Sequence, residues 1–296
     1  MTEYSVYKAG PDSLPGELTS MIPRISRARG FRLYTADGNR LLDLWQYGGS
    51  AVLGHNPPEH LKTLKNSADR GLFTPFPSHY QDRLVKALSL ILPGREFRVY
   101  AGEDALRRSL LTAGFEEAAG LPFPDPVYAA PESAPQAPPG SALSLWRPFL
   151  EEDLFRDIPF LVPVIPLPWM NGPGILAVSG NIGDRAPSLP PSDIVSPLVL
   201  ALAARAVHNL IAARPGPSSR RFPKIRKALD QSVWKSRGIY LFRDRTDGSD
   251  GYDRIFRHFL DHGVLLPPSP RLPAILPGEL SKGEEAKLAD LLSFRP

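Results

Sequence analysis

The stretch FRLYTADGNRLLDLWQYGGSAVLGHNPP, residues Phe31–Pro58, determines how the rest of this chain is interpreted. Two runs of alternating polarity, Phe31–Ala36 and Arg40–Trp45, flank the dipeptide Asp37-Gly38. Asp-Gly between such runs predicts a hairpin, because both central residues of a type I′ turn have positive φ. Asn56 precedes two prolines and can cap a helix with proline in its first turn. The stretch therefore predicts a hairpin, a glycine-rich bend and a capped helix.

Composition sets broad limits on the class of protein. The 296 residues are enough for a sizeable core and one or two domains. Without cysteine, the chain has no disulfide framework, thiolate metal site or cysteine nucleophile. The first residues lack the apolar core of a signal peptide, and no apolar run is long enough to span a bilayer. We therefore expect a cytoplasmic protein without membrane contact.

Charge gives little indication of a polyanionic partner. The net charge is +4, because 35 basic residues nearly balance 31 acidic ones. The basic stretch 220–237 contains Phe222 and Trp234, so a nucleic-acid-binding module is one hypothesis. A solvated helix face is the interpretation that we favour, since long basic side chains commonly cover such faces. Nucleic acid is thus not an expected partner.

Regular elements are predicted outside a proline-rich middle. The chain has 34 prolines, and roughly half of them lie between Leu121 and Pro197, where regular structure should be sparse. Ser281 and Glu284 predict a capping box for the last helix, which should end at Leu292. The other predicted helices are Gly16–Met21, Pro57–Asp69 with Gly71 just past its end, a helix capped by Ser78 that runs through Leu92, Gly102–Ala118, Leu198–Ala213, Phe222–Ser236 and Tyr252–His262. The predicted strands are Phe97–Ala101, Gly238–Arg243 and Val264–Leu266.

Three segments together resemble one enzyme family. Asp43 precedes Gly54 of a Gly-His-x-x-Pro motif by eleven residues, directly after the hairpin. Ser192 and Ser196-Pro197 match the Thr and Asn-Pro of a G-T-x-S-G-N-P motif, and HGVLLPPSPRLPAIL (His262–Leu276) resembles a small-domain segment. In this order and spacing the segments resemble the class III aminotransferases, which are pyridoxal-phosphate enzymes of fold type I. Glutamate-1-semialdehyde aminomutase is the most similar in appearance.

The resemblance implies an α/β fold, namely a trimmed fold type I architecture. We expect a large domain with a mixed, mostly parallel sheet and an α+β small domain. Residues 1–50 would form an amino-terminal arm and hairpin that join the small domain. Residues 51–215 would form a truncated large domain, and residues 216–296 the carboxyl-terminal small domain. The matched parts are roughly residues 24–115 and 192–292, and the middle is much shorter than in active family members.

The family holds its cofactor phosphate where a strand runs through glycine into a helix, because helix amino termini present free N–H groups to an anion. Here the family motif S-G-T-E-A becomes Ala101-Gly102-Glu103-Asp104-Ala105. Two hydroxyl donors are lost, and a carboxylate is gained that repels a phosphate. Gly102 and Ser192 remain as candidate cofactor-binding residues, a pair that we call the remnant phosphate cup.

The resemblance also implies a Schiff-base lysine and an acid beside the ring nitrogen. Lysine is absent between Lys86 and Lys224, the span that should contain it, and arginine cannot substitute because it stays protonated. The strand that best matches the acidic motif, Ile175–Ser179, contains no acid. No catalytic residue can therefore be assigned. The histidines are scattered and predict no metal site: His55, His60, His79, His208, His258 and His262.

The sequence therefore predicts an aminotransferase-like protein that has lost pyridoxal-phosphate chemistry and acts as a binding or structural homologue, with no cofactor expected. The alternative is an active aminotransferase or aminomutase whose lysine is relocated, Lys224 or Lys235 for example, or whose missing residues come from a partner chain. Pyridoxal phosphate would then be the cofactor. The expected partner is a second copy in a homodimer, or a full-length aminotransferase homologue.

Overall fold

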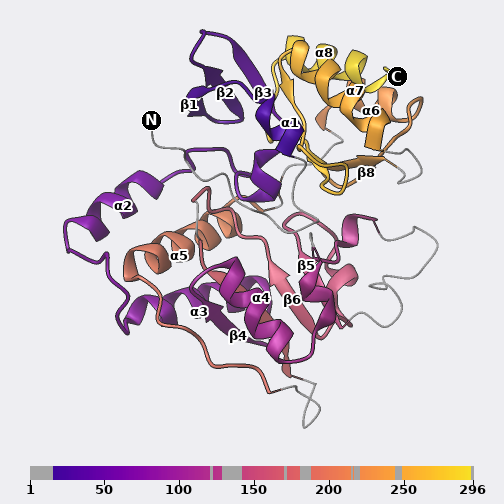
Figure 1. The fold of residues 1–296 in the computed structure, drawn as a ribbon. Helices are drawn as coiled ribbons and strands as arrows, with labels where there is room; N and C mark the ends of the chain where they lie inside the picture. Colours follow the sequence, from indigo (N-terminus) through magenta and orange to yellow (C-terminus); the bar gives the residue numbers. More distant parts are fainter. Residues whose placement is uncertain are drawn as a thin grey trace.

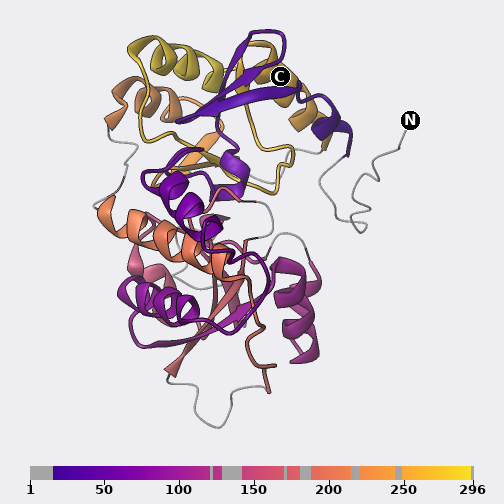
Figure 2. The same ribbon diagram turned by 90° about the vertical axis from the view of Figure 1, so that its left-hand side faces the viewer.

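The computed structural model describes residues 16–120, 123–128, 142–169, 172–180, 188–214, 216, 221–243 and 249–294. Its described elements form two parts (Figure 1). The amino-terminal strands and the carboxyl-terminal helices lie together in one part, and the middle of the chain forms the other. The view turned by 90° shows the same arrangement (Figure 2). The first and last described elements thus share one part of the molecule.

The first sheet confirms the hairpin. It has the order β1 (Ile25–Arg29), β2 (Arg32–Thr35), β3 (Arg40–Asp43) and β10 (Val264–Leu265). Strands β2 and β3 pair antiparallel, as predicted, while β10 pairs parallel with β3. The type I′ turn is wrong: Gly38 has a φ of 83°, but Asp37 is not among the residues with positive φ. The Gly38 N–H instead donates to the Thr35 carbonyl at 3.1 Å, which makes the loop one residue longer.

A three-stranded sheet and three helices complete this part. The sheet has the order β11 (Ala274–Ile275), β9 (Tyr240–Arg243) and β8 (Trp234–Arg237). The helices are α6 (Pro223–Leu229), α7 (Ser249–Asp261) and α8 (Lys282–Leu292), the last with the predicted capping box.

The helix predicted over Phe222–Ser236 is wrong in its second half. Helix α6 ends at Leu229, and the chain then enters β8, which pairs antiparallel with β9 across a turn at Gly238. Phe222 and Trp234 are both buried in the hydrophobic core. They are therefore not available to stack on nucleic-acid bases. The exposed basic side chains of this stretch include Arg221, Lys224, Arg226, Lys227 and Lys235.

The third sheet lies in the other part and has the order β4 (Arg95–Tyr100), β7 (Gly174–Ser179), β6 (Phe160–Pro163) and β5 (Leu143–Trp146). It is mixed, as expected. Among the described strands of this sheet, however, β5–β6 is the one parallel pairing, and β7 runs antiparallel to both of its neighbours. The expectation of a mostly parallel sheet was wrong because β7 separates β4 from the parallel pair.

Helices cover this sheet. They are α3 (His79–Ile91), α4 (Glu103–Thr112) and α5 (Pro197–Ala212). Helix α2 (His60–Ala68) packs on α5, and a short α1 (Gly16–Ser20) lies near the hairpin. The 3₁₀ helices are η1 (Gln46–Gly49), η2 (Glu116–Ala119), η3 (Pro126–Tyr128) and η4 (Glu152–Phe155). Within the described ranges, no helix combines the length and apolar character needed to cross a membrane.

The helix predicted to begin at Pro57 begins three residues later. Its N-cap is Glu59, with a φ of 63°, and not Asn56. Two prolines fix their own φ and push the residue before each towards extended backbone, so the chain needs another turn before it can enter the helix. Gly71, with a φ of 68°, follows the end of the helix as predicted.

Candidate cofactor site

The predicted turn from strand through glycine into helix is present. Strand β4 ends at Tyr100, Gly102 is the N-cap of α4, and the helix begins at Glu103. The turn packs closely on β7: a Cβ on Gly174 would stand 2.4 Å from the Gly102 carbonyl oxygen and 2.8 Å from Leu106 Cβ. The chain's own backbone therefore fills the space between this turn and the sheet.

Ser192 lies beside the same turn. Its Oγ accepts a hydrogen bond from the Val99 N–H at 3.0 Å. The structure thus places both residues of the remnant phosphate cup at the carboxyl end of β4, although they are 90 positions apart in the sequence. The Ser192 oxygen is therefore already a hydrogen-bond acceptor for the backbone of β4.

Asp193 is a residue of this turn that sequence reasoning missed. Its Oδ2 accepts a hydrogen bond from the Ala101 N–H at 2.9 Å, and its own N–H donates to the Val99 carbonyl at 2.8 Å. A signal was available, because an acid directly follows Ser192 and precedes the capped helix α5. A carboxylate of the chain itself thus takes the backbone donor that precedes Gly102.

Glu103 adds a second negative charge at the same turn. Its Oε1 accepts from Arg107 Nε at 2.9 Å and from Arg107 Nη2 at 2.6 Å, one helical turn further along. Glu103 and Asp104 occupy the first turn of α4, where carboxylates complement the helix dipole. The partial positive charge at the start of α4 is thus balanced by carboxylates of the chain itself.

Lysine side chains do not enter the interior in the described part of the chain. Every described lysine is solvent-exposed: Lys62, Lys65, Lys86, Lys224, Lys227, Lys235, Lys282 and Lys287. The two lysines considered as relocated Schiff-base residues, Lys224 and Lys235, belong to this exposed set. Lys224 is the second residue of α6, and Lys235 lies on β8 of the second sheet.

A buried arginine follows one of the two parallel strands. Arg147 comes directly after β5, is 1% exposed, and pairs through Nη2 with Asp125 Oδ2 at 2.6 Å. Arg147 Nη1 donates to the carbonyl of Gly48, a residue of the glycine-rich bend, at 2.8 Å. Burial lowers the pKa of the Arg147 guanidinium, but the charge of Asp125 and the hydrogen bonds to it outweigh burial and leave that pKa raised. The guanidinium therefore stays charged.

Sequence reasoning did not find this ion pair. It matched the acidic motif to Ile175–Ser179, which is the antiparallel strand β7. The available signal was a charged residue directly after the apolar run Leu143–Trp146. Its partner Asp125 lies 22 positions earlier among prolines, so the pairing itself required the fold.

The spacing between Asp43 and the Gly-His motif has a structural cause. Asp43 Oδ2 lies 2.7 Å from His55 Nε2, and Asp43 Oδ1 accepts the N–H groups of Trp45 and Gln46. Gly54 has a φ of 91°, and a Cβ there would stand 3.2 Å from the carbonyl oxygen of Gly30. The segment between Asp43 and His55 therefore forms a loop that brings the His55 ring back to the buried Asp43 carboxylate. This contact supports a structural role for His55.

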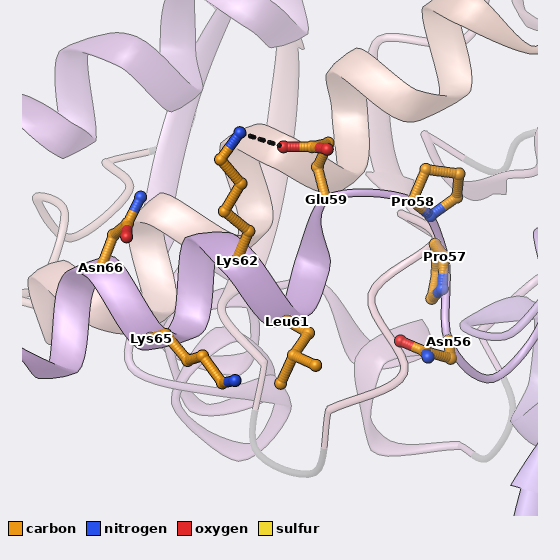
Figure 3. A pocket seen from close by; sticks show the side chains of 8 residues that line it. All are labelled: Asn56, Pro57, Pro58, Glu59, Leu61, Lys62, Lys65 and Asn66. Atoms are coloured by element: carbon orange, nitrogen blue, oxygen red, sulfur yellow. Dashed lines mark ion pairs between the residues drawn. The ribbon is translucent and has the colours of Figure 1, made fainter.

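A shallow groove lies elsewhere, along α2 (Figure 3). It measures about 500 Å³ and is lined by a single continuous segment that includes Asn56, Leu61 and Lys65. Lys62 at its edge pairs with Glu59 at 3.2 Å. The groove does not include the remnant phosphate cup.

Comparisons with known proteins agree on the architecture. No protein-family model matches the chain. An uncharacterized protein of Treponema pallidum is 27% identical over 90% of this chain and 92% of its own length. Glutamate-1-semialdehyde 2,1-aminomutase of Heliobacterium modesticaldum is 33% identical over 30% of this chain, which is 21% of the aminomutase.

Solved aminotransferase structures match nearly the whole chain. Ornithine δ-aminotransferase of Plasmodium falciparum has a TM-score of 0.67 at 12% identity, covering 98% of this chain and 94% of that structure. An ω-transaminase of Thermomicrobium roseum has a TM-score of 0.68 at 14% identity, covering 97% and 95%. The chain therefore shares the fold of the class III aminotransferases and resembles the glutamate-1-semialdehyde aminomutases in part of its sequence.

Proposed function

We propose that this aminotransferase-like protein does not carry out pyridoxal-phosphate chemistry and acts as a binding or structural homologue. The placement of the lysines carries the proposal. A Schiff base requires an amine that can lose its proton next to the bound aldehyde, and desolvation is a usual means of lowering the pKa of a lysine. The described lysines are all exposed, and residues 87–223 contain no lysine.

The residues at the remnant phosphate cup do not fit a phosphate either. The Ala101 N–H already donates to Asp193, and the Ser192 oxygen accepts from the Val99 N–H, which leaves only its O–H as a donor. A phosphate at this turn would also lie near the Asp193 carboxylate that accepts the Ala101 N–H. The turn is exposed to solvent and Glu103 is paired with Arg107, so screening keeps the charge repulsion small and the loss of the backbone donor weighs more.

The residues that follow the parallel strands β5 and β6 give a third line of support. The resemblance implies a carboxylate at the end of a buried strand, where it keeps the ring nitrogen protonated. Strand β5 is instead followed by Arg147, which is neutralised by Asp125, and β6 is followed by Val164 and Ile165. A guanidinium cannot perform that function, because it repels a protonated ring nitrogen.

Absorbance spectroscopy and reduction test the proposal. Purified protein is mixed with one equivalent of pyridoxal phosphate, treated with borohydride and analysed by peptide mass spectrometry. We expect no saturable aldimine band, and only a low, distributed modification of surface lysines. One lysine modified stoichiometrically, with a saturable band, would establish the alternative of an active enzyme with a relocated lysine. A band that forms only after a full-length aminotransferase is added would establish partner-supplied residues.

We also propose that the protein forms a homodimer in the cytoplasm. Three large apolar side chains on α2 and the following loop support this, because Leu61 is 53% exposed and Phe73 and Phe76 are each 62% exposed. Exposed large apolar side chains are favoured at protein contacts. Sedimentation analysis should give a dimer for the wild-type chain and a monomer for the double variant Phe73→Ser, Phe76→Ser. A monomeric wild-type protein would contradict the proposal.

The division into domains is likewise a proposal. The parallel pairing of β10 with β3 and their shared hydrophobic core support a small domain built from both ends of the chain. Limited proteolysis should cut first near residues 50 and 215, and a first cut inside either unit would contradict these boundaries.

A further inference from the structure

Two histidines lie together at the carboxyl end of α7. His258 is in the last turn of the helix, and His262 directly follows Asp261, its final residue. Residues four positions apart share one face of a helix. The centroids of the two imidazole rings are 4.4 Å apart. The sequence predicted no metal site because these residues belong to no recognised longer motif, but the fold places both rings side by side.

The hydrogen bond of His262 leaves its other nitrogen free to bind a metal. His262 Nδ1 lies 2.7 Å from the carbonyl oxygen of His258. A carbonyl only accepts, so this contact requires a proton on Nδ1 and leaves the lone pair on Nε2. Histidines that bind metals commonly donate their second ring nitrogen to a carbonyl in the same way, which fixes the tautomer and the ring orientation.

The ring of His258 is held in place by the end of the chain. It stacks on Phe294 with centroids 3.8 Å apart and an interplanar angle of 14°. The stacking fixes the plane of the His258 ring beside that of His262.

The surroundings favour a cation. The last carbonyl groups of a helix carry partial negative charge, and the Asp261 carboxylate adds a full charge near His258. We propose that His258 and His262 form a two-ligand site for a first-row divalent cation, with Cu²⁺ bound most tightly. Imidazole suits these ions, and Cu²⁺ leads the Irving–Williams order. Among the described residues, no further histidine or acid completes a three-ligand set, so water fills the remaining positions.

Calorimetric titration with Cu²⁺ at pH 7.5 in a non-coordinating buffer tests the site. We expect one ion per chain in the tightest class of sites. Because each histidine supplies one of the two protein ligands, His258→Gln and His262→Gln should each weaken this binding at least about tenfold. The control is His208→Gln, an exposed histidine on α5, which should leave the affinity unchanged. An affinity that survives both ligand substitutions would overturn the proposal.

A second measurement does not depend on variants. Paramagnetic Cu²⁺ broadens NMR resonances near it, so substoichiometric Cu²⁺ should broaden the signals of His258, His262 and Phe294 before those of His208. Uniform broadening, or broadening that begins elsewhere, would overturn the proposal even if one of the glutamine variants failed to fold.

Discussion

The ion pair between Arg32 and Glu284 should control how stability falls in acid. Arg32 Nη2 lies 2.7 Å from Glu284 Oε2, and Arg32 Nε lies 2.9 Å from Oε1, so the contact is bidentate and joins the hairpin to α8. The same carboxylate closes the capping box by accepting the Ser281 N–H. The hydrogen bonds from Arg32, despite burial, lower the pKa of Glu284 from the ordinary 4.5 to about 2.

The magnitude follows from linkage. Such a lowering would be worth about 3 kcal/mol if the pair were shielded from water. Solvent reaches both side chains, which are 17% and 12% exposed, so we expect about 1–2 kcal/mol after screening. The folded-state pKa is the lower one, so this stabilisation is fully present above about pH 4.5 and is lost as the pH falls towards 2. The replacement Glu284→Gln should cost about 1–2 kcal/mol at pH 7 and almost nothing near pH 2.

Urea unfolding followed by circular dichroism between pH 7 and pH 2.5 measures this difference. The curves of unfolding free energy against pH for wild type and Glu284→Gln should converge as the solution is acidified. Glu96→Gln is the control, since Glu96 is 70% exposed and lies 3.7 Å from Arg98, and it should stay within about 0.5 kcal/mol of wild type at every pH. Parallel curves for wild type and Glu284→Gln would refute the reasoning.

Four further substitutions test the local geometry of the fold. Gly174→Ala should lower the free energy of unfolding by about 2–4 kcal/mol, because the new Cβ would stand 2.4 Å from a backbone oxygen. Gly283→Ala, in open space on α8, should instead raise it by about 0.5–1 kcal/mol. Equal melting temperatures for the two variants would contradict this. Glu59→Gly should raise the free energy of unfolding by up to about 1 kcal/mol, since a φ of 63° suits glycine, and a loss in urea titration would count against it. Asp125→Asn should cost about 3–5 kcal/mol by leaving Arg147 buried without a counter-charge, and a cost below 1 kcal/mol would show that water reaches the pair.

The sequence predicted elements best where a local rule decides them. The hairpin, the turn at Gly102 and the capping box at Ser281 depend on neighbouring residues, and all three are present in the structure. The type of the hairpin turn was wrong, since Asp-Gly also suits a longer loop in which only the glycine has positive φ. Short-range signals thus placed elements well but did not determine their finer geometry.

Errors arose where distant parts of the chain decide the outcome. The residues around Trp234 have a helix-compatible pattern, but pairing with β9 and burial in the core make them a strand. Whether β7 runs parallel or antiparallel to its neighbours depends on which strands flank it, and its own residues do not indicate which strands these are. The two carboxylate contacts at the candidate site, Asp193 with Ala101 and Asp125 with Arg147, span 92 and 22 positions and could not be inferred from spacing.

The parallel pairing of β10 with β3 has a consequence for how the chain is made. Val264 stands opposite Leu42, so the edge of the hairpin stays uncovered while the ribosome adds more than 200 further residues. Contacts between such distant partners form late, because a long loop must close before they can form. The nascent chain therefore carries an open strand edge through most of its synthesis, until β10 completes the first sheet.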